Sequence, residues 1–188
     1  MKGIPGREYN LKADFKELHV ESTAVMPYPV PIDSISFAST DVDTLRAVTL
    51  HFTSPQETPS NFYITLQSTE RGSHASPCLK YTIRTDSPGS HYSIAVLKPK
   101  RKISQAENEL QSQDKHDYVP QLAVGEKWIV RLNRVEEAVY NFWKAYDNMI
   151  MFSTSPFISA NESLPTNIQK GYGIWSPQGS SSCVIIVE

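Results

Sequence analysis

The sequence predicts a mainly β fold, an antiparallel β-sandwich-like domain with one amphipathic helix packed near its C-terminal end. Short runs in which apolar and polar residues alternate recur along most of the chain, as in strands with one buried face. Turn-forming residues, with 13 prolines among them, separate these runs. One segment near the end changes to helical spacing. With 188 residues, the chain is long enough to build a sizeable core.

Composition excludes several classes of protein. Lys and Arg number 18 against 20 Asp and Glu, which gives a net charge of −2. With 39% hydrophobic and 20% charged residues, the chain is too apolar for a disordered protein. Its weak charge also argues against nucleic acid as a partner. No apolar run is long enough for a membrane-spanning helix, and residues 1–6 lack the apolar stretch of a signal peptide. From these residues, either the protein is cytoplasmic or the chain is a mature fragment whose leader has been removed.

The first 26 residues predict a β-hairpin. Tyr9, Leu11 and Ala13 alternate with polar residues, and a return strand runs from His19 to Met26. A lone hairpin is only marginally stable in water. Residues 1–26 therefore either belonged to a larger upstream domain or dock on the residues that follow. Prolines at three of the five positions 27–31 predict a stiff, extended linker, which makes this segment the expected domain boundary.

Residues 32–188 predict the main, sandwich-like domain. A first strand is expected from Ile32 to Phe37, and a last one from Cys183 to Val187. The run from Lys98 to Tyr118 carries many charges and few large apolar residues, so we expect a solvated loop there. The positions expected to face the core are Val48, Leu50 and Phe52; Phe62, Ile64 and Leu66; Leu79, Tyr81 and Ile83; Tyr92, Ile94 and Val96; and Trp128, Val130 and Leu132.

One helix is expected over about residues 134–150. Apolar residues recur there at the spacing of a single helical face, from Val135 through Phe142 and Trp143 to Ile150. Asn133 is a suitable N-cap, and Glu136 three places later completes a pair like a capping box. An apolar face of this kind is typical of a helix packed on a sheet.

No motif in the sequence predicts a catalytic, cofactor-binding or metal site. The five histidines are scattered, although His51 and His91 occupy strand positions that can meet in space. The segment Asp114–Asp117 places carboxylates beside His116, but within the expected solvated loop. Asn161 begins a weak glycosylation sequon. Cys78 and Cys183, which are the two cysteines, either form a disulfide or remain free thiols.

The segment from Ser155 to Trp175 is the most distinctive part of the chain. It joins Ser155-Pro156-Phe157 to Thr166-Asn167-Ile168 and then to Gly171-Tyr172-Gly173. This arrangement resembles the closing signature of a family of Bacteroidota envelope proteins, domain of unknown function 4249. The strand Pro5-Gly6-Arg7-Glu8-Tyr9-Asn10-Leu11 and the start Pro31-Ile32-Asp33-Ser34-Ile35 resemble that family as well. The chain departs from the pattern at Thr166, where serine is usual, and at Lys170, where glycine is usual.

The resemblance implies a location and a partner class. Members of the family are typically lipoproteins of the outer membrane or the periplasm, and their genes often accompany those for TonB-dependent transport. Their N-terminal immunoglobulin-like β-domain would make residues 1–26 the remnant of its last hairpin. No catalytic or binding residues are established for the family, so the resemblance assigns none to this chain.

The strand pattern and the lack of catalytic motifs predict a non-catalytic binding or accessory module. The resemblance places it on the outer membrane or in the periplasm and implies membrane attachment only through a lipid anchor absent from this chain. The expected partner is an outer-membrane transport protein or an extracellular ligand, and the oligomeric state stays open. Tyr28, Tyr172 and Trp175 are the candidate contact residues, because exposed aromatic side chains are frequent in binding surfaces. The alternatives are a structural or adhesion spacer and, less favoured by the sequence, a glycan or peptide hydrolase.

Overall fold

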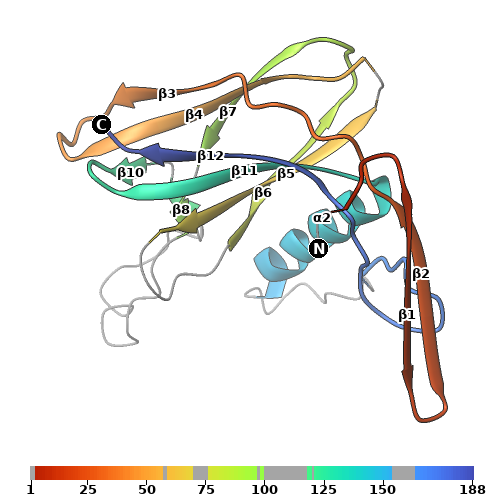
Figure 1. Ribbon diagram of the computed structural model, residues 1–188. Coiled ribbons are helices and arrows are strands. Elements are labelled where there is room, and N and C mark those ends of the chain that lie inside the picture. The colour runs from red at the N-terminus through yellow and green to blue at the C-terminus, as the bar shows by residue number, and fades with distance from the viewer. Residues whose placement is uncertain are drawn as a thin grey trace.

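The computed structural model describes residues 3–56, 59–69, 76–96, 98–99, 118–119, 121–153 and 164–188. Two β-sheets pack face to face, a helix lies against one of them, and a long hairpin projects from the body (Figure 1). The predicted fold class, mainly β with a single packed helix towards the C-terminal end, is confirmed.

The first sheet is centred on β4 (Leu45–Thr53). Strand β3 (Ser34–Ser39) pairs with one side of β4. Strands β7 (His91–Val96) and β10 (Gln121–Ala123) pair with successive parts of its other side. All of these pairings are antiparallel. Strand β3 stands at the end of the strand order and therefore forms one edge of the sheet.

The second sheet has the strand order β12–β11–β5–β6. Strand β11 (Lys127–Val135) lies between β12 (Gly179–Ile186) and β5 (Ser60–Ser68), and β6 (Ser76–Thr85) follows β5. These pairings are also antiparallel, and they place β12 at the edge. A separate short pair joins β8 (Lys98–Pro99) to β9 (Tyr118–Val119), within the run that was expected to be a loop.

The core lies between the two sheets and is built by alternate residues of the strands. The Phe52 and Phe62 rings, one from each sheet, meet with their centroids 5.1 Å apart. Burying side chains of this size stabilises a fold by roughly 1.5–3 kcal/mol each. The predicted inward positions that are fully buried are Val48, Leu50, Phe52, Phe62, Ile64, Leu66, Val96, Val130 and Leu132.

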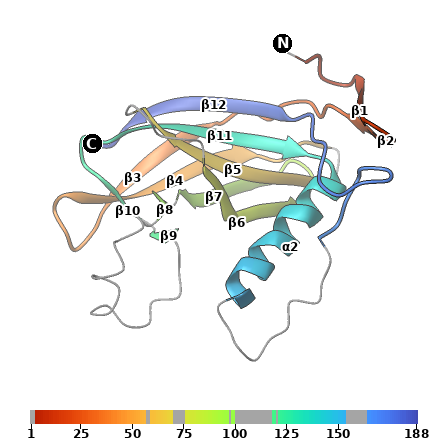
Figure 2. The same ribbon diagram turned by 90° about the horizontal axis from the view of Figure 1, so that it is seen from below.

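Helix α2 (Glu137–Ser153) covers part of the outer face of the second sheet, against β5 and β6 (Figure 2). Val139 and Tyr140 pack with Tyr63 of β5 there. The predicted start near residue 134 is wrong, because β11 continues to Val135. The proposed cap Asn133 is buried in the sheet, where its amide donates a hydrogen bond to the Tyr63 carbonyl. The Glu136 carbonyl instead accepts the first amide bonds of the helix.

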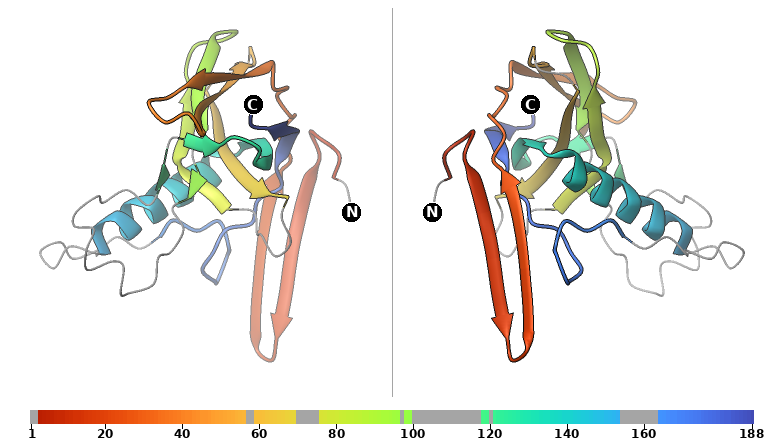
Figure 3. Two further views of the ribbon diagram at one scale, coloured as in Figure 1. Left: turned by 90° about the vertical axis from the view of Figure 1, so that its left-hand side faces the viewer. Right: turned by 90° about the vertical axis from the view of Figure 1, so that its right-hand side faces the viewer.

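The predicted hairpin consists of β1 (Glu8–Phe15) and β2 (Leu18–Val25), and it projects well beyond the sandwich (Figure 3). The C-terminal tail, residues 164–178, packs against it. The Ser22 hydroxyl donates to the Asn167 carbonyl at 2.7 Å, and the Trp175 indole donates to the Tyr9 carbonyl at 3.3 Å. The hairpin therefore docks on the residues that follow it, while its origin in an upstream domain stays a prediction.

Candidate binding groove

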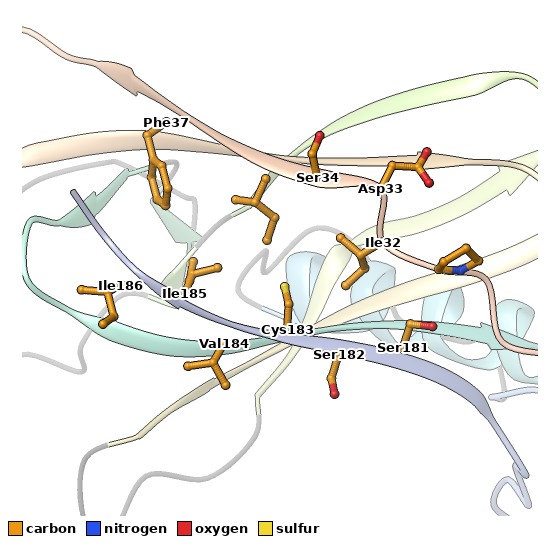
Figure 4. Close-up of a pocket in the computed structure, with 12 residues that line it drawn as sticks. Ile32, Asp33, Ser34, Phe37, Ser181, Ser182, Cys183, Val184, Ile185 and Ile186 are labelled. Carbon is orange, nitrogen blue, oxygen red and sulfur yellow. The ribbon is translucent and has the colours of Figure 1, made fainter.

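A groove separates the edge strands β3 and β12, where the two sheets part at one side of the sandwich (Figure 4). Its cavity measures about 650 Å³. The two strands run in the same direction (Figure 1). Residues from β3 and the end of the linker line one wall, and residues from β12 line the other: Pro31, Ile32, Asp33, Ser34, Ile35 and Phe37, opposite Ser181, Ser182, Cys183, Val184, Ile185 and Ile186.

The floor of the groove is apolar and belongs to the margin of the core. Ile32 and Phe37 point across the gap towards Cys183 and Ile185 (Figure 4). Most of the polar residues that line the walls are serines: Ser34, Ser181 and Ser182. Asp33 is the only carboxylate among the described lining residues. A site of this composition suits a neutral ligand with aliphatic groups.

Asp33 connects one end of the groove to a polar cluster on the outer face of the first sheet. Its Oδ2 accepts a hydrogen bond from the Thr53 hydroxyl at 2.8 Å and lies 3.6 Å from Nδ1 of His91. The His91 ring stacks on the His51 ring with 5.8 Å between centroids, so the two histidines do meet. His51 is in turn within hydrogen-bond distance of the Ser36 and Ser93 hydroxyls.

The Pro-rich linker sets the near end of the groove, because it crosses β12 at Gly179. A Cβ at Gly179 would lie 2.8 Å from the carbonyl carbon of Tyr28 and would also meet the Pro27 oxygen. Only glycine fits under backbone at this distance. Because its prolines make it stiff and extended, the linker spans the gap and leads to the start of β3 on the other side.

The second half of strand β12, from Cys183 onward, is apolar on both faces, although β12 is an edge strand. Ile185 and Val187 reach into the core, whereas Val184 and Ile186 are 58% and 57% exposed. Neither β12 nor β3 contains a charged residue. Edge strands in native sheets usually carry charges or prolines that prevent unwanted pairing. This edge has no such protection.

The structure argues against a Cys78–Cys183 disulfide. Cys183 is a free thiol in the wall of the groove, and burial raises its pKa. Cys78 lies on β6, and the strand order places β5 and β11 between the two cysteines. Three strand spacings amount to about 14 Å, whereas the Cα atoms of a disulfide lie within about 7 Å.

None of the three predicted contact residues lines the groove, although Tyr28 lies beside its near end. Tyr28 and Tyr172 are exposed, at 61% and 94%, whereas Trp175 is part-buried and fastens the tail to the hairpin. Tyr28 lines a smaller cavity of about 260 Å³, together with Arg134 and with Pro31, which it shares with the groove. The groove itself was not predicted from the sequence. The signal that could have indicated it is the uninterrupted apolar run Cys183–Val187, which is typical of a strand with neighbours on every side.

Other sequence features add no further site. Within the described ranges, no group of three His, Cys, Asp or Glu side chains is arranged to hold a metal ion. The same ranges contain no helix that is long and apolar enough to cross a membrane. The segment Asp114–Asp117 and the sequon at Asn161 lie outside the described residues, as do His74 and most of the run from Lys98 to Tyr118.

Comparison with protein families assigns the chain to a family. The model of the family described as Domain of unknown function (DUF4249) matches residues 1–180. The chain belongs to this family. The DUF4249 match spans the hairpin, the linker and helix α2, and it ends just inside β12. No curated protein and no solved structure matches the chain.

Proposed function

We propose that this DUF4249 domain is a non-catalytic binding module of the cell envelope, an accessory part of a lipoprotein that serves TonB-dependent uptake. The groove between β3 and β12 carries the proposal, because it combines an apolar floor with two unprotected strand edges. The location and the link to transport rest on the resemblance of the tail and of the first strand to envelope proteins.

The composition of the groove favours binding over the two alternatives. Glycoside hydrolysis needs a pair of carboxylates, and Asp33 is alone among the described lining residues. Its carboxylate is also already in contact with Thr53 and His91 at the end of the groove. A mere spacer gains nothing from an exposed apolar edge, which is a liability for solubility.

Photo-cross-linking in the native organism tests this function. A photoreactive amino acid is placed at Ser182, which lines the groove, or at Ser87, which lies in the turn between β6 and β7. Strand order puts that turn across the sandwich from the groove. We expect the tagged full-length gene product in the envelope fraction, with a defined cross-linked partner from Ser182 and none from Ser87.

Two results would contradict the proposal. Recovery of the gene product only from soluble cytoplasm would remove the envelope location. Identical cross-linking from Ser182 and Ser87 would remove the groove as the binding surface.

A further inference from the structure

We infer that the groove receives an extended polypeptide strand, uncharged and aliphatic on both faces, which pairs with β12. This inference rests on the proposed function and names the ligand class of the same groove. Addition of a strand to an exposed sheet edge is a recurrent mode of peptide recognition, in which backbone hydrogen bonds give affinity and side-chain pockets give specificity.

The backbone of β12 offers the required groups. The amide of Val187 donates to the Glu126 carbonyl, and the carbonyl of Val187 accepts from the Gly125 amide, so the backbone groups of Val187 face β11. Backbone groups alternate from side to side along a strand. Those of Ser182, Val184 and Ile186 therefore face the open edge, where the described part of the chain provides no strand neighbour.

The side chains of β12 indicate what the missing neighbour is made of. A continuous apolar run is typical of a strand that is covered on both faces. Here Val184 and Ile186 remain more than half exposed, next to the half-buried Ile129 of β11. A strand added beside β12 with aliphatic residues on its outer face would extend this apolar surface and bury part of it. Neither β3 nor β12 carries a charge, and among the described lining residues a charged strand would meet only Asp33, which already accepts a hydrogen bond from Thr53.

The geometry of the groove also sets the direction of the added strand. Because β3 and β12 run the same way, a strand that runs against them is antiparallel to both (Figure 1). It thereby continues the antiparallel pattern of each sheet. Its inward side chains would meet Ile32, Ile35 and Ile185 over the floor of the groove.

An uncharged peptide with blocked ends, Gln-Thr-Val-Ile-Val-Ile-Thr-Gln, is a suitable probe. Two further versions carry N-methyl groups, one on alternate amides, so that a single edge can still pair, and the other on every amide, so that neither edge can pair. Binding to the wild-type chain is measured by fluorescence anisotropy. We expect one methylated version to bind like the parent and the other to lose affinity by about tenfold or more, since each lost hydrogen bond costs about 1 kcal/mol.

Variants at one position provide the matched control. Val184→Pro removes an amide that faces the open edge, and proline is tolerated on the solvent side of edge strands. Val184→Thr keeps that amide and the β-branched shape. We expect Val184→Pro to abolish peptide binding and Val184→Thr to retain it within a fewfold. Thermal unfolding by circular dichroism checks both variants, and the methylated peptides decide the question on wild-type protein should Val184→Pro fail to fold.

Three outcomes would overturn the inference. Equal binding of both methylated peptides would show that pairing with β12 is not used. An absence of peptide binding, while Ser182 still cross-links to a partner, would reject the strand but leave the proposed function intact. Concentration-dependent dimerisation in analytical ultracentrifugation that Val184→Pro abolishes would assign the edge to a second copy of this chain.

Discussion

Gly179 lies so close beneath the carbonyl oxygen of Pro27 that no side chain fits between them. This contact joins residues from opposite ends of the chain, the linker and the first residue of β12. It fixes where the linker crosses the edge of the second sheet. The separation of β3 from β12, and with it the groove, starts at this crossing.

Replacement of Gly179 by alanine tests the crossing. The added Cβ meets backbone rather than a flexible side chain, so either the linker or β12 has to move. We expect the free energy of unfolding to fall by about 1–3 kcal/mol, the usual cost of overpacking. Urea denaturation measures it, with Ser182→Ala as the exposed control on the same strand. Equal stability of Gly179→Ala and Ser182→Ala would show that the linker or β12 can shift at this crossing without loss of stability.

Asn167 is expected to hold the tail in the shape that docks the hairpin. Its side-chain oxygen accepts from the Trp175 amide at 2.8 Å, and its side-chain nitrogen donates to the Trp175 carbonyl at 2.7 Å. Asn167→Ala leaves both backbone groups without these partners and should cost about 2 kcal/mol. Urea denaturation followed by tryptophan fluorescence measures the loss. Gln169→Ala is the control, because Gln169 contacts the hairpin through its backbone. A loss no larger in Asn167→Ala than in this control would contradict the assignment.

Tyr63 should make the fold sensitive to alkali. Burial raises the pKa of its phenol from 10.0 to about 12, partly offset by a hydrogen bond with the Gln178 side chain. Between these two values the unfolded chain releases a proton that the folded chain keeps, so stability is complete below pH 10 and falls as the pH rises towards 12. The loss amounts to about 2–3 kcal/mol at the upper end. Tyr63→Phe should remove this part of the decline.

The measurement compares urea denaturation of the two proteins at about pH 9 and about pH 11. Every other effect of alkaline pH acts on both proteins, so only the difference between them reports on Tyr63. Parallel declines in the wild-type protein and in Tyr63→Phe would mean that the phenol ionises freely in the fold.

Cys183 should react slowly as long as the protein is folded. Burial raises the pKa of its thiol, and the thiolate is the nucleophile in alkylation. We expect iodoacetamide to label Cys183 more slowly than in the urea-unfolded chain, with a rate that rises only at higher pH. Mass spectrometry locates the label. Full labelling of Cys183 after unfolding without reductant would confirm a free thiol, whereas protection under these conditions would indicate a disulfide.

The core could be predicted from the sequence because side chains along a strand point to the same face at every second residue. The alternation of Val48, Leu50 and Phe52 is a local pattern, and burial of one sheet face turns it directly into an inward direction. The start of the helix could not be predicted in this way. Asn133 has the chemistry of an N-cap, but its amide is used by the carbonyl of Tyr63 on a neighbouring strand, and this partner is distant in sequence.

The groove depends on relations that no local pattern encodes. Its walls are the edges of two different sheets, so finding it requires knowing that β3 and β12 lie side by side with a gap between them. The aromatic residues chosen from the sequence show the same limit. Tyr172 and Trp175 are three positions apart, yet one is almost fully exposed and the other fastens the tail to Tyr9. The apolar run Cys183–Val187 carried the more useful signal.

The tail that holds the hairpin continues without interruption into β12. A force on the hairpin can therefore be transmitted through the tail to this strand. Hydrogen bonds at Asn167 and Trp175 join the hairpin to the segment that leads into Gly179, and the hairpin stands roughly across the direction of β12 (Figure 1). A force that passes through these bonds therefore reaches β12 at its first residue, where the pairing with β11 begins. The projecting hairpin is thus connected to the strand that borders the groove. A force applied to the hairpin would therefore act first on that border.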